Sequence, residues 1–103
     1  MKLLILPLFF SLAGCASKVL ITGKVYPPTN HENIILFAQQ KPNCHLVEIG
    51  MITTNVEWNQ EAAVKEAKIK AAEIGATHLN IVDIKRNAFN DAAVKAVAFR
   101  CNE

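Results

Sequence analysis

The chain has 103 residues, of which 51% are hydrophobic, and its formal net charge is +2 at pH 7. This length allows one small domain and excludes two, and it leaves no room for the large nucleotide-binding folds of most cofactor-dependent enzymes. After residue 14, ten Lys and Arg stand against nine Asp and Glu without a basic run, which argues against a nucleic-acid partner.

The N-terminal segment has the layout of a targeting sequence. Lys2 precedes an apolar stretch over 3–12, which is too short to cross a membrane as a helix. The residues Leu-Ala-Gly-Cys at 12–15 then resemble the bacterial lipobox. This resemblance implies a lipoprotein signal peptide over 1–14, with Cys15 becoming the lipidated first mature residue. The alternative is an ordinary secretory signal followed by a coincidental cysteine.

Residues 15–18 are expected to be the lipidated N-terminus and a short leader, and 19–103 a single small domain. Position 16 is Ala, whereas an Asp after the lipidated cysteine usually retains bacterial lipoproteins at the inner membrane. We therefore expect a lipid anchor in the outer membrane, with the domain facing the periplasm.

Three strand candidates come first in the domain. The segment 19–25 is β-branched and stops at two prolines, and 34–37 is short and apolar. The third candidate, 46–53, alternates in polarity. The alternation predicts one face with Val47, Ile49 and Met51 and another with Glu48 and Gly50.

The next predicted element is a helix. Asn59 is suited to cap a helix that extends to about Ile74, because its side chain can accept a hydrogen bond from the first turn. Apolar residues recur at spacings of three and four, which is the stripe of an amphipathic helix; they are Val64, Ala67, Ala71 and Ile74. Gly75 is a natural stop. The many alanines predict a slim helix that lies close to a sheet.

Two strand candidates follow, at 78–85 and 94–101. The alternation of the first breaks at Ile81-Val82, where either both faces are covered or a bulge intervenes. The second places Val97, Phe99 and Cys101 on one face. The order of elements predicts an α+β fold: a small, mostly antiparallel sheet of about four to five strands, covered on one face by one amphipathic helix.

With Cys15 assigned to lipid, Cys44 and Cys101 remain as a pair. The periplasm is oxidising, so the pair predicts one structural disulfide between the last strand and the loop before the third. A redox dithiol and a metal pair are the alternatives, although no Cys-x-x-Cys motif is present. Cys44 and Cys101 are 57 positions apart. In the chain-entropy model, a disulfide that closes a loop of this length stabilises a small domain by about 4 kcal/mol.

The sequence offers little for catalysis. Ser17 is the sole serine behind the signal segment, and Cys44 and His45 would point to opposite faces of an extended chain. His31, His45 and His78 are scattered without metal-ligand spacing. We therefore expect no enzyme activity, no catalytic residue, no metal site and no cofactor.

Trp58 and Phe89 are two aromatic residues that fall outside the predicted core strands. Trp58 directly precedes the predicted helix, where it could simply pack against the helix start. Each is also a possible contact for a protein partner, because aromatic side chains often anchor interfaces.

Three segments together resemble the small bacterial outer-membrane lipoproteins of unknown function of the YjeI type. These segments are Cys-His-Leu-Val-Glu-Ile-Gly at 44–50, Ala-x-x-x-Ala-Ala-Glu-Ile-Gly-Ala-Thr-His-Leu at 67–79 and Ala-Val-Ala-Phe-Arg-Cys at 96–101. A more distant resemblance is to RcsF-like lipoproteins, which sense envelope stress. Those proteins carry two disulfides and a long proline-rich tether, and this chain has neither.

The favoured hypothesis is a non-enzymatic, lipid-anchored envelope protein that binds another envelope component, most simply a protein, close to the membrane. The alternative is an RcsF-like outer-membrane stress sensor in phosphorelay signalling. A second alternative is a periplasmic domain that binds a metal or small ligand, for which at least two of the three histidines would have to converge.

Overall fold

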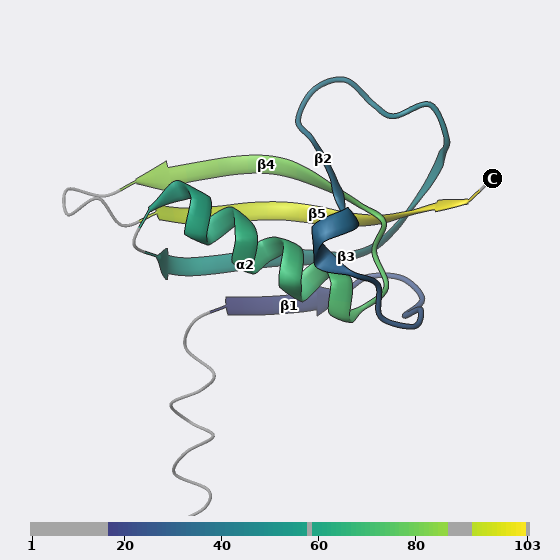
Figure 1. Cartoon of the computed structure of the whole chain (residues 1–103), viewed down its shortest axis with the longest axis horizontal. Coiled ribbons are helices and arrows are strands. Elements are labelled where there is room, and N and C mark those ends of the chain that lie inside the picture. The colour runs from purple at the N-terminus through teal and green to yellow at the C-terminus, as the bar shows by residue number, and fades with distance from the viewer. Residues whose placement is uncertain (1–16, 58, 87–91, 103) are drawn as a thin grey trace, which may run out of the picture.

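The computed structural model describes residues 17–57, 59–86 and 92–102. In this part of the chain a single α-helix lies across a five-stranded sheet (Figure 1). The elements are β1 (Ser17–Ile21), the short 3-10 helix η2 (His31–Asn33), β2 (Ile35–Phe37), β3 (His45–Glu57), α2 (Gln60–Glu73), β4 (His78–Arg86) and β5 (Ala92–Asn102).

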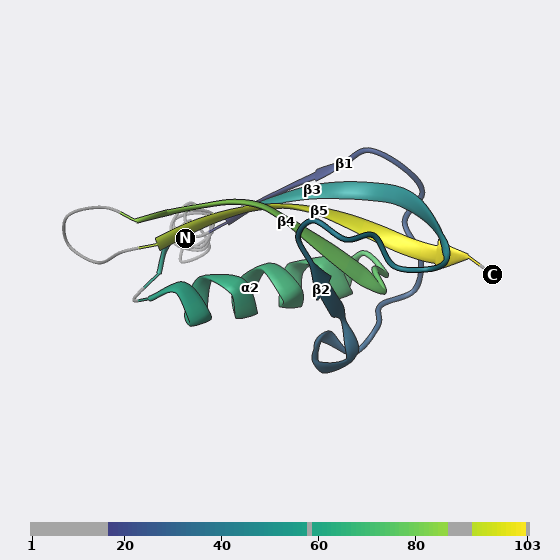
Figure 2. The ribbon, with the colours of Figure 1, turned by 90° about the horizontal axis from the view of Figure 1, so that it is seen from above.

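The strand order across the sheet is β1-β3-β5-β4-β2. The three pairings among β1, β3, β5 and β4 are antiparallel, whereas the edge strand β2 runs parallel to β4. The predicted α+β class is therefore confirmed, and the parallel edge makes the sheet mixed. Figure 2 shows α2 on one side of the sheet and no other described helix or strand against the opposite side.

The helix begins and ends where its capping residues predict. The Asn59 side chain accepts a hydrogen bond from the Ala62 N–H at 2.8 Å, which satisfies one of the free donors of the first turn. At the other end Gly75 has φ +91°, and the N–H groups of Gly75 and Ala76 bond back to the carbonyls of Ala72 and Ala71. This pattern is a Schellman motif, which needs a residue in the left-handed region. Among the described residues, no helix has the length and apolarity needed to cross a membrane.

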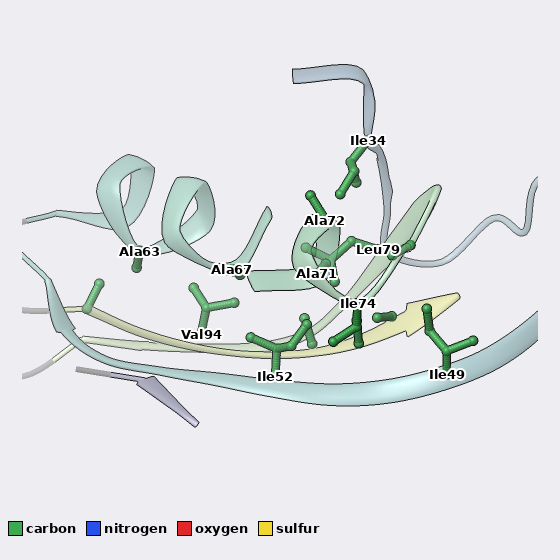
Figure 3. Packing of buried hydrophobic residues seen from close by; sticks show 14 residues of the cluster. Ile34, Ile49, Ile52, Ala63, Ala67, Ala71, Ala72, Ile74, Leu79 and Val94 are labelled. Atoms are coloured by element: carbon green, nitrogen blue, oxygen red, sulfur yellow. The ribbon is translucent and has the colours of Figure 1, made fainter. Parts of the chain in front are cut away.

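The hydrophobic core lies between α2 and the sheet (Figure 3). The helix contributes mainly alanines, of which Ala63, Ala67 and Ala71 have no exposed surface. The face of β5 that opposes them is equally small, with Ala96 and Ala98 fully buried. Small side chains on both surfaces allow a close approach, so the prediction of a slim helix near a sheet is confirmed.

Register shifts in β3 and β4 interrupt the alternation of their side chains. In β3 the register shifts between Glu48 and Gly50, so Ile49 is buried against the helix while Met51 lies on the other face of the sheet. The prediction that Met51 shares a face with Ile49 was therefore wrong. In β4 a shift between Ile81 and Asp83 confirms the bulge alternative at Ile81-Val82.

The strand bounds also differ from the prediction. β1 ends at Ile21 instead of position 25, because the N–H groups of Thr22 and Gly23 both turn to the carbonyl of Ile49. β3 and β5 are longer than expected, since they pair with each other almost over their whole length. Cross-strand pairing, which sequence alternation does not reveal, extends both strands.

Replacing Gly75 with Ala should lower the free energy of unfolding by about 2–4 kcal/mol, because a Cβ would meet both an unfavourable φ and the backbone and Cβ of Tyr26. Urea denaturation of the disulfide-bonded protein measures this change. The matched control is Glu73→Ala, an exposed position two residues earlier, for which a change under about 0.5 kcal/mol is expected. Equal stability of the two variants would contradict the role given to Gly75.

Candidate functional site

Cys44 and Cys101 form the predicted disulfide. Their Cα atoms are 5.9 Å apart, and 57 positions separate them in the sequence. The bond joins the residue just before β3 to the end of β5, and Leu46 pairs with Cys101 in the neighbouring register. Because its sulfur is bonded to Cys101, Cys44 is not available as a thiol partner for His45 in this state.

The disulfide also fixes the segment 38–44. This segment connects β2 at one edge of the sheet with β3 beyond β5, so it has to cross the ends of β4 and β5. A cavity of about 340 Å³ lies beneath it; the lining includes Phe37, Lys41, Cys44, His45, Asn80 and Phe99. The cavity places Cys44 beside a space that a small molecule can enter.

His78, the first residue of β4, lies in the same region with only 7% of its surface exposed. Its ring contacts Phe37 edge-on, with the two centroids 6.4 Å apart. The Thr77 hydroxyl lies 2.9 Å from Nδ1 of His78 and accepts the backbone N–H of Cys101 at 2.8 Å. Burial lowers the pKa of His78 below its ordinary value of 6.5, because the charged ring loses solvation.

The two sulfur atoms and a ring nitrogen of His78 gather at one point. The ligand-type atoms of Cys44, His78 and Cys101 all lie within 4.8 Å of one another, and they form the only such group of three among the described residues. The three residues come from separate segments of the chain, so their spacing in the sequence does not predict the cluster. It contains one histidine, whereas the hypothesis from sequence required two.

The opposite side of the sheet from α2 carries a second candidate region, which we call the open face. Strand register places an apolar row across three strands, Leu20, Met51 and Val97. The adjacent row consists of Lys18, Thr53 and Lys95. Leu20 is 61% exposed, and a groove runs between the two rows over β1 and β3.

Charged residues continue the second row. Asp83 pairs with Lys95 in the register of β4 and β5, and Lys85 lies two residues further along β4 on the same face. The open face is thus an apolar strip bordered by more positive than negative groups. Such a combination is typical of a surface that another molecule covers.

The described residues do not include every predicted site. Cys15, Trp58 and Phe89 lie outside the described residues, so their predicted roles stay predictions. His31 is in η2 and does not belong to the group formed by Cys44, His78 and Cys101.

No family model, curated protein or solved structure matches the chain. The proposed function therefore rests on the residues of the cavity beside the disulfide and of the open face.

The free energy of unfolding should fall as the pH drops below 6.5, because His78 is favoured in its neutral form in the folded state and ionises more readily once unfolded. The contribution of neutral His78 to the free energy of unfolding is fully present above the pKa that His78 has in the unfolded chain. It is lost as the pH falls towards the lower pKa of His78 in the folded protein. Urea denaturation at about pH 7.5 and about pH 5.5 should show a smaller difference for His78→Gln than for the wild type.

The wild-type ring is neutral at about pH 7.5, so the stability difference between the two proteins at that pH measures the packing effect of the substitution apart from the loss of titration. An identical pH difference in both proteins would show that His78 does not contribute to the pH dependence.

Proposed function

We propose that this protein is a lipid-anchored, non-enzymatic component of the bacterial envelope that binds another envelope protein through the open face of its sheet. The observation that carries the proposal is the apolar row of Leu20, Met51 and Val97, which neither α2 nor another described element covers. An uncovered apolar strip on a small soluble domain is costly unless a partner covers it.

The chemistry of the open face suggests the kind of partner. Lysines lie along one side of the apolar row, where Lys18 and Lys95 stand on either side of Thr53. A complementary surface would present apolar side chains flanked by carboxylates, since opposite charges at the rim steer association and set the register. We therefore propose a partner with an acidic rim.

The proposed anchor is close in sequence to a strand of this face. Ser17, the first residue of β1, follows Cys15 by two positions, and Lys18 and Leu20 are in the same strand. A lipid on Cys15 would hold the first strand near the membrane surface, because two residues span less than about 8 Å even when extended. The proposed partner is accordingly a protein that is itself at the membrane.

Lipidation is tested by growing cells with labelled palmitate. We expect the wild-type protein to carry the label and to fractionate with membranes, and Cys15→Ala to lose both properties. Cys44→Ala is the matched control, because it removes a cysteine outside the lipobox and should keep the label. An unlabelled wild-type protein would contradict the anchor while leaving the open face as a candidate interface.

Partner binding is tested with a photo-crosslinking residue in place of Lys95, in the middle of the open face. We expect one discrete adduct with another protein in intact cells. The matched control replaces Lys65, which is exposed on α2, and it should give no such adduct.

Three outcomes at position 95 would contradict the proposal. Adducts with lipid alone would mean that the face lies against the membrane, an adduct of twice the protein mass would indicate a second copy, and no adduct would leave the face without a partner. Adding Lys18→Glu should reduce the yield of the expected adduct, because it places a negative charge against an acidic rim.

A further inference from the structure

The end of the sheet held by the disulfide contains three ligand-type side chains without a role in partner binding. The sulfur atoms of Cys44 and Cys101 and a ring nitrogen of His78 lie within 4.8 Å of one another. Tetrahedral zinc, with bonds of about 2.3 Å to sulfur and about 2.0–2.1 Å to nitrogen, separates its ligand atoms by about 3.5–3.8 Å. Side-chain movements on the order of an ångström would bring this group to that spacing.

We propose that reduction of the Cys44–Cys101 disulfide converts this cluster into a zinc site with two thiolates and the His78 imidazole as ligands. The site is independent of the open-face interface and of the lipid anchor. Two cysteines and one histidine are a known protein ligand set for zinc, with a fourth position left for water.

The backbone around the cysteines is held by contacts other than the disulfide. Leu46 and Cys101 are neighbours in the antiparallel pairing of β3 and β5, and that ladder continues to Glu57 and Ala92. After reduction the two sulfur atoms should therefore stay close together. A Cα separation of 5.9 Å suits a disulfide and also permits two thiolates on one metal ion.

The position of His78 is also fixed in advance. It is almost fully buried, and Phe37 packs against its ring. The Thr77 hydroxyl joins His78 Nδ1 to the backbone N–H of Cys101, so one hydroxyl orients two of the three proposed ligand residues. Hydrogen-bonded partners of this kind hold the ligands of natural zinc sites.

Cys44, one of the three proposed ligands, lines the cavity of about 340 Å³, which has space for a water as a fourth ligand. Asn80 lines the same cavity, and its side-chain oxygen is buried without a hydrogen-bond partner among the described residues. A zinc-bound water would supply the missing donor. This orphaned oxygen is a second observation that points to a polar occupant of the cavity.

The redox step requires a dithiol reductant. A thiolate of the reductant attacks the Cys44 sulfur, which lines the cavity, and breaks the disulfide so that Cys101 leaves as a thiolate. The second thiol of the reductant then attacks the mixed disulfide, which releases Cys44 and leaves the reductant as a disulfide. Two electrons and two protons have moved to the protein. Zinc binding releases two thiol protons to solvent and gives two thiolates on the metal.

The test uses the full chain purified in detergent with Cys15→Ser, so that no third thiol interferes. Zinc is titrated in competition with a chromophoric chelator, once with the disulfide intact and once after reduction and removal of the reductant under argon. We expect one equivalent of zinc in the reduced protein and none in the oxidised protein. Zinc should also raise the Tm of the reduced protein alone, because a ligand specific for the folded state stabilises it.

Three variants locate the ligands. Cys44→Ser and Cys101→Ser should abolish tight binding, and His78→Gln should weaken it at least about tenfold. His31→Gln is the matched control, since His31 lies in η2 outside the cluster, and it should bind zinc like the reduced parent protein.

A cobalt spectrum keeps the test decisive if a variant does not fold. Cobalt in the reduced protein should show thiolate charge-transfer absorption and the strong visible bands of a tetrahedral site. The proposal is overturned if the reduced protein takes up no zinc, if the oxidised protein binds equally well, or if His78→Gln folds and binds zinc unchanged.

Discussion

Contact between small side chains on α2 and β5 sets the spacing of this domain. Ala67 and Ala71 face Ala96 and Ala98, and all four are fully buried, so the helix lies close to the central strand. Such a core is thin: among the described residues, the largest side chains that are completely buried are only Ile49, Ile52 and Leu79. A thin core contributes little burial energy in a domain of this size, and contacts at the ends of the sheet add to the stability of the fold.

Those contacts concentrate at the end of β5. Arg100 points to the helix side, where its guanidinium donates to the Gly75 carbonyl at 2.9 Å and stacks over the Tyr26 ring at 4.8 Å. Its neighbour Cys101 points to the other side and forms the disulfide with Cys44. Successive side chains of β5 point to opposite faces of the sheet, so Arg100 holds the helix end on one face and Cys101 holds the segment 38–44 on the other. The rest of the open face stays available for the proposed partner.

Much of the fold could be predicted from local signals. Asn59 and Gly75 mark the helix ends because capping and left-handed backbone are chemical requirements of those positions. The pairing of Cys44 with Cys101 could be predicted as well, once Cys15 was assigned elsewhere. The face of Met51 could not be predicted, because a bulge one residue earlier shifts the alternation, and the need for that bulge arises only when β3 is paired with β5.

The amino-acid sequence by itself determined the class of fold, the helix and the cysteine pair, because each depends on neighbouring residues or on a count. Only the tertiary structure decided which residues from different strands lie side by side. It brings His78 to the two cysteines from a different strand, and it aligns Leu20 and Val97 in one uncovered row across strands far apart in the chain. The spacing of these residues in the sequence predicts neither arrangement, because both arise from strand order and register in the completed sheet.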